Sequence, residues 1–223
     1  MIRLDIISKS ETARYMGVKG IPDKKTAEIL DKYEPIVRER LRPAFVYRET
    51  AVHFVDDGVY LDGVDAVFSG SDIKNHLKDC ERAVILAVTV SAEADKLIRQ
   101  TSVVGMAEAL AVDCLCSSAI EQVCNKAEDE IFRVNPVKFR TWRFSPGYGD
   151  LPITLQKNLI SALNAHRRIG LTVTENCMLI PSKSVTAIIG ISDNPIEKGK
   201  KGCDVCNIRD TCGVRMNGGC GKN

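Results

Sequence analysis

The sequence lacks a long hydrophobic run. Its longest uninterrupted apolar stretch covers residues 83–88, whereas a helix needs about 20 apolar residues to cross a bilayer. Residues 1–5 show no sign of a secretion signal, because they contain neither an apolar segment nor a small-residue cleavage site. We therefore expect a cytoplasmic protein without a membrane partner.

A strong charge of one sign is also absent. The 31 Lys and Arg residues nearly balance the 29 Asp and Glu residues, and the formal net charge is +2. Such a small charge creates no field that would attract nucleic acid or an anionic membrane. The basic run at Lys198, Lys200 and Lys201 is too short for a nucleic-acid footprint. We expect no nucleic-acid partner.

Nucleotide-binding loops and paired histidines are missing as well. The chain contains no G-x-G-x-x-G and no P-loop, so a nucleoside-type ligand would not bind as it does in a doubly wound sheet. The three histidines, His53, His76 and His166, stand far apart. No second histidine lies at ligand spacing, so we interpret them as surface or core residues.

Cysteine, in contrast, is abundant. Five of the nine cysteines stand among apolar or small residues and are predicted packing positions: Cys80, Cys114, Cys116, Cys124 and Cys177. The other four form a C-x2-C-x5-C-x7-C pattern near the C-terminus: Cys203, Cys206, Cys212 and Cys220. In a reducing compartment this crowding favours a metal over disulfides. Zinc and an iron–sulfur cluster both fit four thiolates, and a basic tail without metal is the alternative.

The pattern of apolar residues predicts a mixture of helices and strands. Helices are expected at residues 10–16, 22–40, 71–80 (with Ser71 as its cap), 92–100, 103–133 and 154–168. Strands are expected at residues 44–61 (a hairpin turning at 56–58), 64–68, 83–90, 137–144, 171–179 and 184–191. The continuous apolar run at 83–90 is typical of a strand covered on both faces.

The order of these elements indicates the fold class. The hairpin and the late pair of strands do not follow a βαβ rhythm, so we predict an α+β fold with a mixed, mainly antiparallel sheet and packed helices. A chain of 223 residues suits one sizeable core. We predict a single domain over residues 1–195 and a short Cys-rich, metal-binding tail over residues 196–223, where apolar residues become rare.

One turn carries residues suited to a small ligand. Arg143 to Tyr148 form an R-x-x-x-G-Y pattern, and Pro146-Gly147 within it predicts a type II turn. The guanidinium of Arg143 suits a carboxylate, and Tyr148 offers a ring face to a cation or a sugar. The simpler interpretation is a strand end, a tight turn and a surface aromatic residue, because so short a pattern is weak evidence by itself.

Two further blocks follow this turn, residues 169–175 (I-G-L-T-V-T-E) and residues 181–185 (P-S-K-S-V). In this order the blocks resemble the S-adenosylmethionine-binding activation domain of cobalamin-dependent methionine synthase. The resemblance covers roughly residues 1–195 and is specific from about 140 to 192. It implies that the turn, with Arg143, Pro146, Gly147 and Tyr148, binds S-adenosylmethionine. Glu175 matches the family's Thr-Glu strand.

The chain departs from the family at several positions. Residues 149–152 (G-D-L-P) replace a Pro-Ala-Cys-Pro-type stretch, and Ile180 stands where an aromatic residue usually precedes the proline. A sulfonium also benefits from a nearby anion, and Asp150 and Glu175 are the candidates. The sequence contains no module for homocysteine, folate or cobalamin, so the resemblance implies a free-standing activator.

The implied activity is that of a methyltransferase component. The chain would bind S-adenosylmethionine and support reductive methylation, which reactivates cob(II)alamin on a separate cobalamin-dependent methionine synthase or related corrinoid methyltransferase. The partner would bring cobalamin, and a flavodoxin or ferredoxin would supply the electron. No general base is expected, and the catalytic residues stay unknown. Two alternatives remain: a non-catalytic zinc-containing binding module, or an iron–sulfur electron-transfer module for a corrinoid protein.

Overall fold

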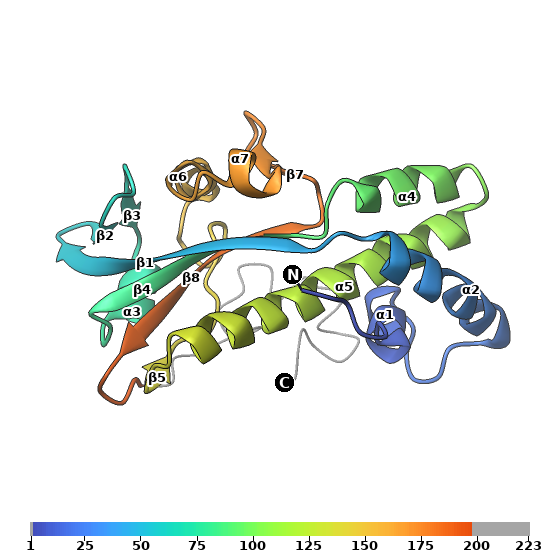
Figure 1. Ribbon diagram of the computed structural model, residues 1–223, viewed down its shortest axis with the longest axis horizontal. Helices are drawn as coiled ribbons and strands as arrows, with labels where there is room; N and C mark the ends of the chain where they lie inside the picture. The colour runs from blue at the N-terminus through green and yellow to red at the C-terminus, as the bar shows by residue number, and fades with distance from the viewer. Residues whose placement is uncertain (1, 198–223) are drawn as a thin grey trace.

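The computed structural model describes residues 2–197 (Figure 1). The four candidate metal ligands, Cys203, Cys206, Cys212 and Cys220, lie outside these residues. The helices are α1 (Lys9–Tyr15), α2 (Lys24–Arg40), α3 (Ser71–Leu77), α4 (Glu93–Ser102), α5 (Met106–Val134), the 3-10 turn η1 (Ile153–Leu155), α6 (Gln156–Ala162) and α7 (Ala165–Ile169). The strands are β1 (Ala44–Val55), β2 (Gly58–Leu61), β3 (Val67–Ser69), β4 (Arg82–Thr89), β5 (Phe139–Arg140), β6 (Thr172–Val173), β7 (Leu179–Ile180) and β8 (Ser184–Ser192).

One six-stranded sheet organises the molecule. Its strand order is β3-β2-β1-β4-β8-β5, and each neighbouring pair is antiparallel. β4 and β8 pair along their whole length, from Arg82 opposite Ile191 to Thr89 opposite Ser184. β6 and β7 form a separate two-stranded hairpin. The prediction of an α+β fold with a mainly antiparallel sheet is confirmed.

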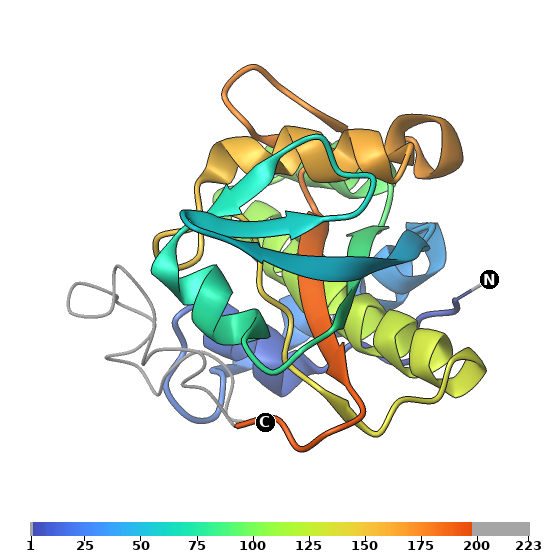
Figure 2. The same cartoon turned by 90° about the vertical axis from the view of Figure 1, so that its left-hand side faces the viewer.

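Helices cover both faces of this sheet. Figure 1 shows α5 along one face and α6 and α7 over the other, and Figure 2 shows α6 and α7 above the strands. Side chains of β4 alternate between the two cores: Val84, Leu86 and Val88 pack with α5, while Ile85 and Ala87 pack with α3, α6 and α7. This arrangement confirms that the strand predicted at 83–90 is buried on both faces.

The core also contains the scattered cysteines. Cys80, Cys114, Cys116, Cys124 and Cys177 are all buried free thiols, as their apolar surroundings predicted. Burial raises the pKa of Cys80 and that of Cys116 to about 12. These thiols are therefore protonated at neutral pH, which agrees with a role in packing.

Across residues 2–197, the structure has no helix with the length and hydropathy needed to span a membrane.

Three elements expected in the second half of the chain differ from the structure. The helix expected at 154–168 is divided because Asn164 adopts a left-handed conformation, with φ of 50°, between α6 and α7. The strand expected at 171–179 is instead the β6–β7 hairpin, with Cys177 at φ 61° in its turn. Of the strand expected at 137–144, only β5 and a single bridge between Phe144 and Ile188 are formed.

The helix expected at 71–80 is shorter, and Ser71 does not cap it. α3 begins at Ser71, is preceded by Gly70, and ends at Leu77. Its N-terminal amides are instead capped by the carboxylate of Asp150, which is far away in the sequence. Only the tertiary fold brings this residue to α3.

Candidate functional site

The predicted turn forms a compact corner, residues 143–151, at the edge of the main sheet. The Tyr148 amide donates to the Ser145 carbonyl at 3.0 Å, and Gly147 has φ of 94°, so the turn is type II as predicted. The Leu151 amide donates to the Tyr148 carbonyl, and the Gly147 amide donates to the Leu151 carbonyl. These bonds use the amides of Gly147 and Tyr148 within the corner. Pro146 is buried, whereas Gly147 and Tyr148 are exposed.

Asp150 fastens the corner to α3. Its carboxylate accepts from the Ser71 amide at 2.7 Å, the Ser71 hydroxyl at 2.8 Å and the Asp72 amide at 3.1 Å. The Asp72 carboxylate in turn accepts from the Asp150 amide at 3.0 Å. Burial alone would raise the pKa of Asp150, but the hydrogen bonds from Ser71 and Asp72 lower it below its usual value. Asp150 is thus occupied as a helix cap and is not free to face a sulfonium.

Arg143 points to the opposite side of the corner, toward α5. Its guanidinium donates to Asn125 Oδ1 at 3.1 Å and to Glu121 Oε2 at 3.1 Å, and it also pairs with Glu128. The side chains of Arg143 and Glu128 are only 21% and 14% exposed, whereas that of Glu121 is 48% exposed. Arg143 is therefore half-buried between the sheet edge and α5.

The three α5 partners were not predicted from the sequence. Glu121, Asn125 and Glu128 are spaced by four and three residues, so they lie on one side of the helix. The recurrence of polar residues on one side of a helix that otherwise carries small and apolar residues could have predicted a polar contact there. However, nothing in the local sequence shows that Arg143 is their partner.

The charges around Arg143 leave a surplus of one negative charge, because two carboxylates surround one guanidinium. Burial alone would lower the pKa of Arg143, but the carboxylates of Glu128 and Glu121 raise it above its usual value. The guanidinium therefore stays charged at every physiological pH. A surplus negative charge suits a ligand that carries a net positive charge.

An aromatic cluster occupies the other side of the corner. The Tyr148 ring, 50% exposed, lies 6.2 Å from the Trp142 ring and 6.0 Å from the Phe144 ring. His76 completes the cluster against Trp142 and Phe144, and its Nε2 lies 2.8 Å from the Thr141 hydroxyl. Burial lowers the pKa of His76 to about 4, so the imidazole is neutral at physiological pH. The exposed Tyr148 ring can stack against a flat ligand group.

The two parts of the corner share one strand-like segment. Trp142 and Phe144 pack into the core beneath α3 and α6, whereas Arg143 contacts α5. This alternation follows from the extended backbone, in which successive side chains point to opposite faces. A ligand that contacts both the guanidinium and the Tyr148 ring must therefore lie across the edge of the sheet.

Comparison with known proteins identifies the family. A family model described as "Vitamin B12 dependent methionine synthase, activation domain" matches residues 67–195, more than half of the chain. The chain belongs to this family. The matched region contains the corner, α5 and β8.

A solved structure supports the activation-domain fold. The crystal structure of the MetH reactivation domain bound to AdoHcy matches with a TM-score of 0.58 and 15% sequence identity. The match covers 87% of this chain and 71% of that one. A search of curated proteins found no match. At this identity the structural likeness concerns the fold.

Glu175 lies apart from the corner in this activation domain. It is exposed in the turn of the β6–β7 hairpin, and within residues 2–197 its carboxylate has no hydrogen-bond or ion-pair partner. The hairpin turn is held by Gln156, whose amide donates to the Cys177 carbonyl at 2.8 Å. The structure thus places Arg143 and Tyr148 on opposite sides of one corner, and Glu175 on a different element.

The P-S-K-S-V block fastens the start of β8 to the helices. Ser182 donates to Asp95 of α4 through its amide at 3.1 Å and also through its hydroxyl. Lys183 pairs with Asp113 at 2.9 Å and donates to Ser117 at 2.8 Å, both on α5. The block that resembled the family therefore positions β8, the strand that pairs with Phe144 of the corner.

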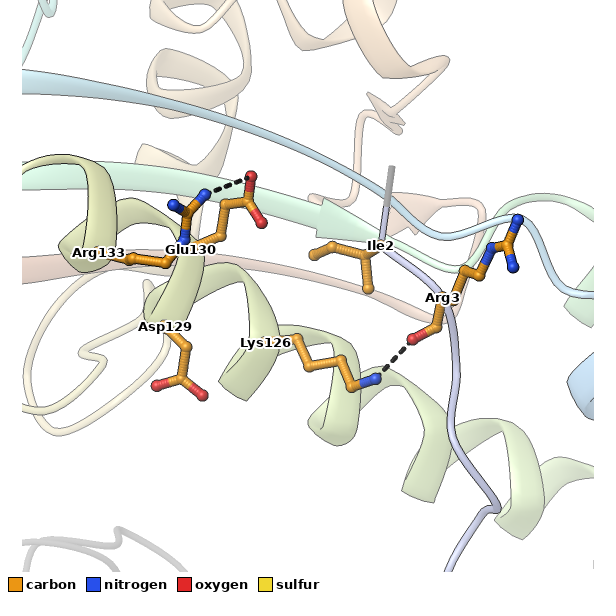
Figure 3. A pocket seen from close by; sticks show the side chains of 6 residues that line it. All are labelled: Ile2, Arg3, Lys126, Asp129, Glu130 and Arg133. Atoms are coloured by element: carbon orange, nitrogen blue, oxygen red, sulfur yellow. Dashed lines mark hydrogen bonds and ion pairs between the residues drawn. The ribbon is translucent and has the colours of Figure 1, made fainter.

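Two cavities lie elsewhere. One of about 310 Å³ lies between the N-terminal segment and α5, where Lys126 donates to the Arg3 carbonyl and Arg133 pairs with Glu130 (Figure 3). Another of about 450 Å³ lies near Phe54, Cys80 and Pro195. Neither is lined by a corner residue. In the described part of the chain, no group of three or more His, Cys, Asp or Glu residues could hold a metal ion.

Proposed function

We propose that this activation domain binds S-adenosylmethionine at the corner and supports reductive methylation of cob(II)alamin. The cobalamin would be carried by a separate methionine synthase or a related corrinoid methyltransferase. The main support is the Arg143–Tyr148 corner, which lies inside the region matched by the family and exposes Gly147 and Tyr148. The AdoHcy bound to the similar MetH domain adds support for a ligand of this class.

The corner offers a group for each part of this ligand. A guanidinium has five N–H groups, and Arg143 uses three in the contacts with α5, which leaves N–H groups for the amino-acid carboxylate. Glu121 is a half-exposed carboxylate beside Arg143 that can face the positive charge of the ligand. The Tyr148 ring provides a face for the adenosine, and Pro146 and Gly147 hold the turn in shape. Because the Gly147 and Tyr148 amides are used internally, the corner offers carbonyl oxygens to the adenine.

The reaction places few demands on acid–base chemistry. A one-electron donor, such as a flavodoxin or ferredoxin, reduces cob(II)alamin to cob(I)alamin on the partner protein. The electron pair of cobalt(I) forms the cobalt–carbon bond, the carbon–sulfur bond breaks, and its electron pair stays on sulfur. The products are methylcobalamin and S-adenosylhomocysteine. No proton moves, so the chain's contribution is to bind, orient and expose the methyl donor.

Calorimetry with S-adenosylmethionine tests this function. Arg143→Lys keeps a positive charge beside Glu121 and Glu128 but removes the planar fork, so we expect binding to weaken at least about tenfold. Arg140→Lys is the matched control, because Arg140 lies over the Phe132 ring and outside the corner. Wild-type protein that does not bind would contradict the function. Binding left unchanged by Arg143→Lys would contradict only the site.

The four C-terminal cysteines favour a second candidate function. Cys203, Cys206, Cys212 and Cys220 provide four thiolates in a short segment, which suits an iron–sulfur cluster or zinc. A cluster would make residues 196–223 an electron-transfer module for the corrinoid protein, whereas zinc would make them a structural clip. The domain boundary at residue 195 and the bound metal stay predictions, as does a cytoplasmic location.

A further inference from the structure

We infer that Glu121 makes the site selective for the positively charged methyl donor over its uncharged-sulfur product. This inference rests on the proposed function, because it concerns the same corner and the same ligand. It assigns Glu121 as a specificity residue, a role separate from the carboxylate recognition proposed for Arg143.

A charged strip on α5 provides the setting. Its members recur at intervals of four and then three residues, and thus lie along one side of the helix: Asp113, Ser117, Glu121, Asn125 and Glu128. Two cations from other elements contact this strip, Lys183 at Asp113 and Ser117, and Arg143 at the last three members. Three carboxylates and two cations leave the strip with one surplus negative charge.

Glu121 is the carboxylate of the strip that can face a ligand. Glu128 is largely buried against Arg143. Asp113 is 43% exposed, but it is paired with Lys183 and lies about two helical turns from Glu121, away from the Arg143 contacts. Glu121 is 48% exposed and uses one oxygen, Oε2, for Arg143. Among residues 2–197, its other oxygen, Oε1, has no hydrogen-bond donor. Along α5, Glu121 is the Arg143 contact that lies nearest to the contacts of Lys183.

The two ligands differ in a way that isolates this charge. S-adenosylmethionine and S-adenosylhomocysteine share the carboxylate, the ammonium and the adenosine, and differ by one methyl group and the positive charge on sulfur. When the methyl leaves, the bonding pair stays on sulfur and its charge is lost. A half-exposed carboxylate a few ångströms from the sulfur would favour the sulfonium by about three- to tenfold. The product would be held less tightly and exchange for a new donor.

Calorimetric titration with both ligands tests the inference. Wild-type protein should bind S-adenosylmethionine more tightly than S-adenosylhomocysteine. Glu121→Gln should reduce this preference by about three- to tenfold, mainly through weaker binding of S-adenosylmethionine. Glu121 is half-exposed, so the variant should fold normally. Glu130→Gln is the matched control, because it removes a carboxylate of α5 that pairs with Arg133 outside the strip; its preference should equal that of wild type.

Two results would overturn the inference while leaving the proposed function intact. The first is an unchanged preference in Glu121→Gln. The second is an equal loss of affinity for both ligands, which would show that Glu121 only positions Arg143 or binds the shared ammonium group. Wild-type protein that binds neither ligand would refute the proposed function, and the inference with it.

Discussion

Arg143 and Asp150 lie in the same corner, but their surroundings give them different roles. Asp150 accepts three hydrogen bonds from the start of α3, and these bonds occupy the carboxylate. Arg143 is held by α5 carboxylates, yet keeps N–H groups for a ligand. At the scale of single residues, the hydrogen-bonding groups that remain unused therefore decide the role: Asp150 has a structural role, whereas Arg143 is a candidate binding residue.

The neutral, buried His76 predicts how the stability of the protein depends on pH. Its pKa is about 4 in the folded protein and near 6.5 in the unfolded chain. Between these values the unfolded chain binds one more proton, so the free energy of unfolding falls as the pH decreases from 6.5 toward 4. We expect a loss of about 2 kcal/mol between pH 7 and pH 5 from this residue. Urea unfolding of wild type and His76→Gln at both pH values measures it.

His76→Gln keeps a polar group for the Thr141 hydroxyl but cannot titrate in this range. The variant should therefore lose less stability on acidification than wild type. Equal losses in the two proteins would show that His76 is solvated, and that the burial attributed to it is wrong.

At the scale of elements, α3 depends on a cap supplied from another part of the chain. The Asp150 carboxylate binds the amides of Ser71 and Asp72, where the helix also favours a negative charge. The same bonds hold the corner in place. The stability of a helix end and the shape of the candidate site are thus linked through one carboxylate.

Replacing this cap should affect both stability and binding. We expect Asp150→Ala to lower the free energy of unfolding by about 1–2 kcal/mol and to weaken S-adenosylmethionine binding, because the corner is released from α3. Asp23→Ala is the matched control, since Asp23 caps α2 through the Thr26 amide at 2.8 Å, away from the corner. It should reduce stability similarly without changing affinity. Urea unfolding and calorimetry check both effects; equal affinity losses would contradict the link.

At the scale of the whole molecule, the fold extends beyond the region matched by the family. The match begins at residue 67, yet β1 pairs with β4 from Ala44 opposite Thr89 to Ala51 opposite Arg82. Ile7, Leu30 and Val37, from the N-terminal segment and α2, share one core with α5. Residues 2–66 are therefore part of the same folded domain, and they support the helix that carries the charged strip.

The C-terminal cysteines give a prediction for the full chain. Anaerobically purified protein should contain iron with acid-labile sulfide if the tail transfers electrons, or zinc without visible absorbance if it is a structural clip. A Cys203→Ser/Cys206→Ser variant should lose the metal, because two of four thiolates are removed. Cys80→Ala is the control, since this buried thiol lies in the core, and it should keep the metal. Metal-free wild-type protein would contradict both assignments.

Much of the local structure follows from the sequence alone. The hairpin of β1 and β2, the doubly buried β4 and the type II turn at Pro146-Gly147 were all predicted. These features depend on the alternation of apolar residues and on backbone preferences within a few neighbouring residues. Such information is present in any short stretch of the chain.

The tertiary structure alone determined which distant groups meet. It paired Arg143 with Glu121 of α5, placed the Asp150 carboxylate as a cap at the start of α3, and divided the helix predicted at 154–168. These outcomes depend on how the helices pack across the sheet, because a side chain's partners and burial are set by elements far away in the sequence. The sequence therefore determined the elements and the corner's shape, and packing decided which charges in that corner are free to bind.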